Sequence, residues 1–342
     1  DLHSFPTRRS SDLVVGENDR AYYLTYLPSP RNSEANCIKI TGMKKNCQPT
    51  LIEAVPNFSD GRNPETIEAL RNAVRLTPSV RLVNVHQDAD HNRSVFTLIG
   101  EGEPLRECAL NLVGVAAERI DLETQRGVHP RIGATDVVPF VPLRNASMDD
   151  CVRLAREAAR QISERYPIPT YLYALASIRP DRTKLSELRR GNYERLKTAI
   201  GNDPYFEPDF GPKRLASAGA TAVGARPILI AYNVFLVSNR VDHAKEIAKK
   251  IRESSGGLPG VQALGLPVGG RAQVSTNLLD YRKTPLNTLF AAVRTEAEKL
   301  GESVERAELI GCLPAAALEG VTPEEIGLFD WDESRLLDRS VG

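Results

Sequence analysis

Short apolar runs alternate with segments of helical periodicity from residue 51 onward. Residues 51–55 have the sequence LIEAV and predict a strand, whereas Asn63 followed by Pro64 predicts the start of a helix. Further segments of the same two kinds follow: strands at 80–85 and 94–100, a helix at 104–120, a strand at 137–141, a helix at 148–165 and a strand at 170–174. The order β-α-β-β-α-β is typical of the split-βαβ, ferredoxin-like arrangement, in which a mostly antiparallel sheet carries its helices on one face.

The same order recurs in the second half of the chain. The pattern predicts strands at 226–237, 261–267, 272–281 and 308–313, and helices at 242–254 and 286–300. Between the halves, residues 183–200 predict a charged helix, and residues 202–212 predict a loop fixed by three prolines.

We therefore expect an α/β (α+β) protein with two ferredoxin-like subdomains. Each is expected to have a mixed sheet with helices on one face, and the two sheets are expected to lie against each other with a cleft between them. The expected division is an unrelated or disordered N-terminal segment, two subdomains and a tail, at residues 1–48, 49–226, 227–320 and 321–342.

Composition and charge exclude several classes of function. The 44 lysines and arginines balance the 44 aspartates and glutamates, so no net field favours nucleic acid or an anionic membrane as a partner. No apolar run approaches the roughly 18 residues of a membrane span. The five cysteines form no CxxC pair, and Cys108 and Cys151 fall on apolar helix stripes. We expect buried free thiols and, without a signal peptide pattern, a cytoplasmic location.

A dense polar turn is predicted between two apolar strands at residues 86–93, with the sequence HQDADHNR. A solvated hairpin loop is one interpretation, because loops are polar by default. A metal site would use His86, Asp88, Asp90 and His91, but ligands this close in sequence rarely converge on one ion. A loop that recognises an anion or an amide, with Arg93 as its guanidinium fork, is better supported, and we expect no metal.

A second cluster lies in GVHPRIGATD at residues 127–136. Two glycines and a proline fix a bent backbone, and the i, i+2 spacing of His129 and Arg131 places both on one side of an extended segment. A structural histidine bonded to the backbone is one interpretation. A general base with an anion clamp is the other, with Asp136 close by in sequence.

Glycine-rich and amide-rich segments follow later in the chain. Residues 208–226 contain PDFGP and a run of glycines and alanines, which suit either a flat ligand or a tightly packed turn. No dinucleotide or phosphate-loop motif is present in the sequence. Alternation places Gln273, Ser275 and Asn277 on one face of a strand, either as a hydrogen-bonding wall or as a solvated face.

Six motifs occur in the order seen in glutamate formimidoyltransferases. They are VPNFSDGRN at 55–63, NR at 92–93, HPRIGATD at 129–136, PDFGP at 208–212, GAR at 224–226 with Asn233, and QVSTNLLD at 273–280. From about residue 50 to 315 the chain resembles this family. It therefore also resembles the transferase domain of formimidoyltransferase-cyclodeaminases, without the cyclodeaminase domain. The resemblance implies transfer of a formimino group from N-formimino-L-glutamate to N5 of tetrahydrofolate in histidine degradation. It also implies two α/β subdomains that enclose a substrate tunnel, and a homodimer.

The resemblance assigns roles to particular residues. It implies that His129 is the catalytic base, that Arg131 holds a substrate carboxylate or the tetrahedral intermediate, and that Asn57 bonds the pterin. His86 stands where animal members have an assisting aspartate, so Asp88 or Asp90 is expected to supply that charge. The residues expected to bind tetrahydrofolate are Asn57, Asp136, Gly211, Pro212, Ser217, Gly219, Arg226, Gln273 and Asn277.

Two alternatives stay open. The same fold is compatible with transfer of a formyl group or conversion of 5-formyltetrahydrofolate, because O and NH differ by one hydrogen-bonding group. A non-catalytic folate-binding protein would keep Asn57 without needing His129. In every case the expected partners are small molecules. For formimino transfer they are formiminoglutamate and tetrahydrofolate polyglutamate.

Overall fold

The computed structural model describes residues 13–16, 20–23, 41–42 and 49–341, and the chain divides into two compact units, residues 1–49 and 50–342. In the first unit, β1 (Leu13–Gly16), β2 (Arg20–Tyr23) and β3 (Thr41–Gly42) form a sheet in the order β1-β2-β3. These short strands lie in the N-terminal segment that is expected to be unrelated or disordered. The remaining predictions for residues 1–48, and for Cys37 and Cys47, lie outside the described residues.

The second unit begins with a seven-stranded sheet. Its strands are β4 (Leu51–Ala54), β5 (Asn57–Phe58), β6 (Val80–Asp88), β7 (Arg93–Gly100), β8 (Thr135–Arg144), β9 (Thr170–Ala174) and β10 (Thr221–Ala225). Their order is β4-β7-β5-β8-β10-β9, with β6 paired to β7. Strand β10 runs parallel to β8 and β9, and the other pairs are antiparallel. The first sheet is therefore mixed, as expected.

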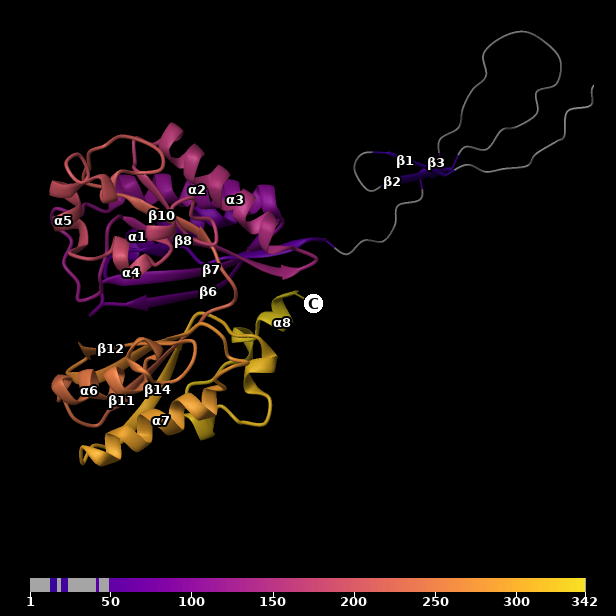
Figure 1. Cartoon of the computed structure of the whole chain (residues 1–342). Helices are drawn as coiled ribbons and strands as arrows, with labels where there is room; N and C mark the ends of the chain where they lie inside the picture. The colour runs from indigo at the N-terminus through magenta and orange to yellow at the C-terminus, as the bar shows by residue number, and fades with distance from the viewer. Residues whose placement is uncertain (1–12, 17–19, 24–40, 43–48, 342) are drawn as a thin grey trace, which may run out of the picture. The chain divides into compact units, whose positions relative to one another are not determined.

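Three helices cover one face of this sheet, as Figure 1 shows: α1 (Pro64–Arg75), α2 (Gly102–Arg119) and α3 (Met148–Arg165). The predicted helix start is confirmed, because the Asn63 side chain accepts a hydrogen bond from the backbone N–H of Glu65 at 2.9 Å. Ser147 and Asp150 form a capping box at the start of α3. Leu70 and Leu112 belong to the core that these helices form with the sheet.

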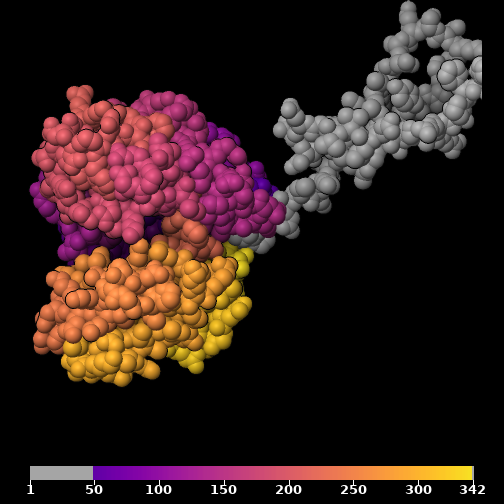
Figure 2. Space-filling view, in the orientation of Figure 1, coloured from indigo at the N-terminus to yellow at the C-terminus, as the bar shows by residue number. Residues whose placement is uncertain are grey.

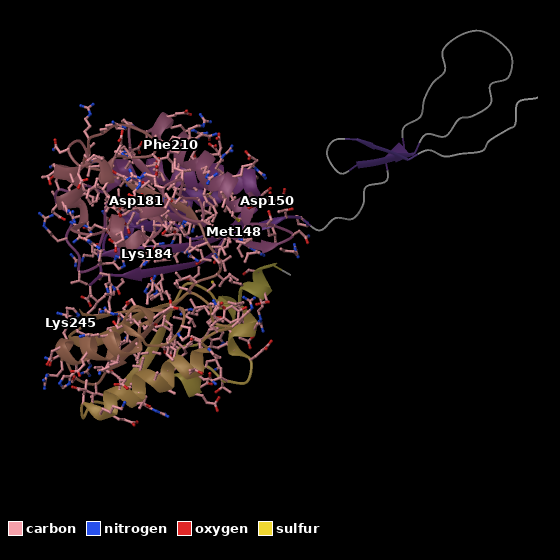
Figure 3. The ribbon with its side chains drawn as sticks, in the orientation of Figure 1. Met148, Asp150, Asp181, Lys184, Phe210 and Lys245 are labelled. Carbon is pink, nitrogen blue, oxygen red and sulfur yellow. The ribbon has the colours of Figure 1, made fainter. Side chains whose placement is uncertain are left out.

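The opposite face of the first sheet is also covered, which corrects the expectation of helices on one face. The predicted helix at 183–200 is broken into η1 (Pro180–Arg182), α4 (Leu185–Leu188) and α5 (Asn192–Ala199), followed by η2 (Pro204–Phe206). Leu188 and Phe206 from this segment pack on Tyr171 of β9. Figure 3 marks the segment at Asp181 and Lys184.

The second subdomain has a four-stranded sheet of β11 (Ile230–Leu236), β12 (Val261–Val268), β13 (Arg271–Leu278) and β14 (Val304–Ile310) in the order β12-β13-β11-β14. This sheet is antiparallel throughout, not mixed as expected. Helices α6 (Val241–Ile251) and α7 (Leu286–Lys299) cover one face. The strand predicted at 226–237 is wrong in its first part, because β10 ends at Ala225 in the first sheet and β11 begins at Ile230.

Residues 311–341, which include most of the expected tail, pack against the rest of the unit. They contain η4 (Ala315–Leu318), η5 (Glu324–Ile326), η6 (Glu333–Arg335) and α8 (Leu337–Val341). Ile326 belongs to the core of the second subdomain, where the Tyr232 hydroxyl donates to its carbonyl. Leu337 packs with Ile99 of β7.

The helix-free face of the second sheet lies towards β6 of the first sheet. His86 Nε2 on β6 is 4.0 Å from Glu308 Oε1 on β14, and Gly269 N donates to Asp90 Oδ2 at 2.5 Å. In Figure 2 the surface is hollowed where the two subdomains meet. The described grooves lie along α2 and α3 and beside α7, so the tunnel between the sheets remains an expectation.

Candidate active site

Arg93, the first residue of β7, joins three of the predicted site residues. Its Nε donates to Asn57 Oδ1 at 3.0 Å, its Nη1 lies against the ring nitrogens of His129, and Nη1 is 4.0 Å from Asp136 Oδ2. Burial, and then the charge of Arg189, lower the pKa of Arg93 to about 9, so the guanidinium is still a cation at pH 7. The cluster is therefore built around a buried positive charge.

His129 is held in one tautomer by its own loop. Its Nδ1 lies 2.7 Å from the carbonyl oxygen of Pro130, and a carbonyl only accepts, so Nδ1 carries the proton and Nε2 carries the lone pair. Burial, followed by the charges of Arg93 and Arg189, holds the pKa of His129 well below its usual range. The imidazole is neutral at pH 7 and can accept a proton at Nε2.

The turn before Arg93 packs tightly on the loop that carries His129. Asn92 adopts a φ of 47°, and its side chain accepts from Gly61 N at 3.1 Å and donates to Arg126 O at 2.9 Å. A Cβ on Gly127 would lie 2.2 Å from the carbonyl oxygen of His91, so only glycine permits this approach. This close packing places Arg93 and His129 together.

Asp136 and Arg189 form a second layer of charge beside His129. Asp136 Oδ1 accepts from Ile132 N at 2.9 Å, and its Oδ2 pairs with a guanidinium nitrogen of Arg189. Arg189 follows α4 and was not predicted, because nothing in the local sequence indicates that this charged segment returns to Asp136. Two guanidiniums, of Arg93 and Arg189, share one carboxylate, which leaves excess positive charge near His129.

His86 and Asp88 lie on β6 rather than in a loop, which corrects the predicted loop at 86–93. Burial lowers the pKa of His86 to about 4 against the opposing charge of Asp88, so His86 is neutral at pH 7. Asp88 bonds His91: its Oδ2 is 2.6 Å from His91 Nδ1, and its Oδ1 accepts from His91 N at 2.7 Å. The His91 ring stands edge-on to that of His129, with centroids 5.9 Å apart.

The side chain of Arg131 bonds the segment at 180–206 that covers the opposite face of the first sheet. Its Nη2 donates to Gln125 O at 2.9 Å and to Glu194 Oε1 on α5 at 3.1 Å. The side chain of Arg131 is buried, whereas that of Glu194 is 59% exposed. Glu194 is therefore a partner that an incoming carboxylate would be able to replace.

The glycine-rich segment lies apart from Arg93 in the contacts of the described residues. Gly219 has a φ of 68° and forms a backbone bridge with Gly133, and Ser217 accepts from Leu122 N through its carbonyl at 2.8 Å. Gly211 is exposed, with Pro212 beside it, and lies close to Ser163 of α3 and to Ile168 in the link from α3 to β9. Of these residues, Gly219 supports the His129 loop through its bridge to Gly133.

The remaining predicted residues lie on the two facing sheets. Arg226 follows β10, and its charge acts on Glu53 of β4 and on Tyr173 of β9. Gln273 is fully buried on the helix-free face of the second sheet, and neither amide atom has a partner among the described residues. Asn277 is exposed. Gln273 is thus available to bond a ligand, at the cost of an unpaired amide without one.

The described cysteines do not supply a nucleophile. Cys108, Cys151 and Cys312 are free and buried, as predicted for the first two. Burial raises the pKa of Cys108 to about 11 and the pKa values of the other two to about 12, so the thiolate is scarce at pH 7. Among the residues that the structure describes, no group of His, Cys, Asp and Glu side chains is arranged to hold a metal ion. In the same part of the chain, no helix has the length and apolar character of a membrane span.

Comparison with known proteins defines the class of this site. Residues 51–226 match the N-terminal subdomain of the formiminotransferase domain, and residues 231–322 match the formiminotransferase domain. An enzyme of the transferase class fits both the fold and the neutral imidazole.

Relatives of known name agree with this class. The chain is 41% identical over 296 residues to glutamate formimidoyltransferase of Thermoplasma acidophilum, covering 85% of this chain and 97% of the relative. It is 39% identical over 285 residues to the enzyme of the same name from Streptococcus pyogenes, with 82% and 95% covered. It is also 42% identical over 277 residues to formimidoyltransferase-cyclodeaminase of Sus scrofa, covering 78% of this chain but 51% of the relative. The chain belongs to the formiminotransferase family.

Proposed function

We propose that this enzyme transfers the formimino group of N-formimino-L-glutamate to N5 of tetrahydrofolate, giving 5-formiminotetrahydrofolate and glutamate in histidine degradation. The observation that carries the proposal is the neutral imidazole of His129, whose Nε2 lone pair lies beside the buried cation of Arg93. A neutral base held against a guanidinium is suited to take a proton from an amine while an anionic substrate is bound.

In the proposed reaction, N5 attacks the amidine carbon and a bond forms between them. His129 Nε2 takes the N5 proton as this bond forms, after the substrate has displaced the N–H of Arg93 from that lone pair. The bond between the amidine carbon and the glutamate nitrogen then breaks, and the same proton passes to that nitrogen. The proton count is unchanged over the reaction, so His129 ends neutral and ready for another cycle.

The carboxylates of formiminoglutamate require cationic partners. Arg131 would hold one of them by exchanging Glu194 for the substrate, because Glu194 is the exposed member of that pair. Arg93 and Arg189 share only Asp136, and their excess charge supports the same anionic substrate.

For tetrahydrofolate as co-substrate, we propose a binding surface on both facing sheets. Asn57 would bond the pterin, and the unpartnered amide of Gln273 would bond it from the second sheet. The other proposed contacts are with Asp136, Gly211, Pro212, Ser217, Gly219, Arg226 and Asn277. We further propose a tunnel between the sheets for a polyglutamate tail, and a homodimer that acts in the cytoplasm.

The test is glutamate release from formiminoglutamate and tetrahydrofolate, with wild type compared with His129→Ala. We expect the variant to bind folate, followed by fluorescence, and to lose roughly 100-fold or more in rate, the size of a general-base contribution. His243→Ala is the matched control, since His243 Nδ1 pairs with Glu302 at 2.7 Å in the second subdomain.

Two results would contradict the proposal. If wild type binds folate and releases no glutamate, formimino transfer is wrong, and 5-formyltetrahydrofolate should then be tried as the substrate. If His129→Ala turns over as fast as His243→Ala, the reaction stands and His129 is not its base.

A further inference from the structure

His91 is a buried histidine beside the site that the mechanism above does not use. Its Nδ1 lies 2.6 Å from Asp88 Oδ2. Although burial alone would raise the pKa of Asp88, the hydrogen bonds from His91 lower it, so Asp88 is a carboxylate that only accepts. Nδ1 of His91 therefore carries the proton. Nε2 carries a lone pair, is buried and has no partner among the described residues.

The geometry brings the ring of His91 close to the ring of the proposed base. The rings of His91 and His129 stand edge to face, at an interplanar angle of 83° and a centroid distance of 5.9 Å. A proton can pass over such a separation when the rings tilt or when one water lies between the nitrogens. The carbonyl of His91 also rests on Gly127, which fixes the two histidines to one packed unit.

The two histidines face opposite charges. An imidazolium at His129 stands beside the cations of Arg93 and Arg189, which disfavour it. An imidazolium at His91 stands on the carboxylate of Asp88 and also interacts with the carboxyl of Glu308 on β14. The other titratable group facing His91 is His86 of β6, which is neutral at pH 7. An imidazolium therefore meets a counter-charge at His91 and like charges at His129.

We propose that His91, oriented by Asp88, stores the proton that His129 removes from N5 and returns it through His129 to the glutamate nitrogen. His91 is thus a positioning residue for the proton and does not touch the substrate. The inference rests on the proposed function. One proton moves from His129 Nε2 to His91 Nε2 and back, so no other reactant is needed.

The test compares His91→Gln with the matched control His243→Gln, which removes the histidine of another carboxylate pair. Glutamine can still bond Asp88 but cannot hold a proton. We expect His91→Gln to lower kcat by about 10- to 100-fold, as for loss of a proton-transfer group, with KM and folate binding within about twofold of wild type. The control should keep the wild-type kcat.

The pH profile of kcat separates this role from a structural one. We expect the acid limb of the kcat profile to differ between wild type and His91→Gln. In Asp88→Asn the acid limb should move to lower pH, because the imidazolium of His91 loses its counter-charge. Imidazole in solution should restore part of the rate of His91→Gly.

An unchanged kcat in His91→Gln, or a lower kcat with an unchanged pH profile and no rescue by imidazole, would overturn the inference while leaving formimino transfer intact. A wild-type enzyme that releases no glutamate at any pH would instead remove the proposed function, and this inference with it.

Discussion

Arg93 acts on its neighbours in two separable ways. Its charge acts on His129, and its shape orients Asn57. The charge lowers the pKa of the imidazole, after burial the largest cause. The planar guanidinium also donates to Asn57 through both Nε and Nη2. A lysine ammonium cannot reproduce this two-armed contact. Substitutions that keep one property and remove the other are therefore informative.

We expect Arg93→Gln to move the acid limb of the kcat/KM profile to higher pH. Removing the positive charge removes a cause that lowers the pKa of His129, so the pKa rises and the base stays protonated up to a higher pH. Burial persists in the variant, so the pKa stays below its usual range. The measurement is kcat/KM for glutamate release from pH 5 to 9.

Arg93→Lys provides the control. It keeps the charge, so the acid limb should stay in place while the rate falls through lost orientation of Asn57. An acid limb at the wild-type pH in Arg93→Gln would show that the guanidinium does not set the pKa of His129.

At this scale, the residues that lie in recognisable motifs could be predicted from the sequence, whereas those that only the fold brings to the site could not. Asn57, His129 and Asp136 lie in motifs of the family, and Arg93 stood out as a cation in a polar turn. Arg189 lies 53 residues from its partner Asp136, and no local pattern records such a pairing. His91 was considered only as a metal ligand, because its bond to Asp88 depends on how the turn folds.

At the scale of elements, periodicity predicted the helices that pack one apolar face on a single core. The helix that begins at Pro64 and the helix at 148–165 were predicted because each has an apolar stripe and a cap. The helix at 183–200 was not resolved into pieces, although Gly191 takes a φ of 85° that ends regular helix there. The run at 226–237 was predicted as one strand because apolar residues continue across Pro227, whereas only β11, Ile230–Leu236, pairs in the second sheet and residues 226–229 link it to β10.

Strand β4 contains a buried acid whose ionisation affects stability. Glu53 pairs with Ile99 of β7 and Val141 of β8, and is 5% exposed. Burial raises its pKa from 4.5 to about 7, against the opposing charge of Arg226. Because the folded state binds this proton more tightly than the unfolded state, the stability that it contributes is complete below pH 4.5 and is lost as the pH rises through 7.

We expect Glu53→Gln to unfold with a higher free energy than wild type at pH 8, by up to the order of 3 kcal/mol, and to lose this advantage at pH 5. Glutamine fills the same volume without a charge to desolvate. Urea unfolding of both proteins at the two pH values gives the difference directly. A difference that is equal at pH 5 and pH 8 would mean that Glu53 is not protonated in the folded protein at pH 5.

Within residues 50–342, the end of the chain connects the two subdomains. The backbone at Leu313 pairs with that at Leu336, and Arg335 Nη1 donates to the carbonyl of Leu309 on β14 at 2.9 Å. Leu337 then enters a small core with Cys312 and Ile99, the latter on β7 of the first sheet. The segment predicted as a tail therefore shares a core with the first subdomain, at one end of the facing sheets that carry Glu308 and His86.

We expect Leu337→Ala to lower the free energy of unfolding by about 2–5 kcal/mol, the usual range when a buried leucine is truncated. Phe329→Ala is the matched control, because Phe329 lies in the same C-terminal segment and is 63% exposed, so its loss should change stability by less than about 0.5 kcal/mol. The measurement is urea unfolding, with glutamate release followed on the folded variants.

Since Leu337 and Ile99 belong to different subdomains, the loss of the Leu337 side chain should also weaken the packing of β14 against β6 and reduce turnover. Equal stability of the two variants would show that the C-terminal segment rests on the first sheet without holding the subdomains together.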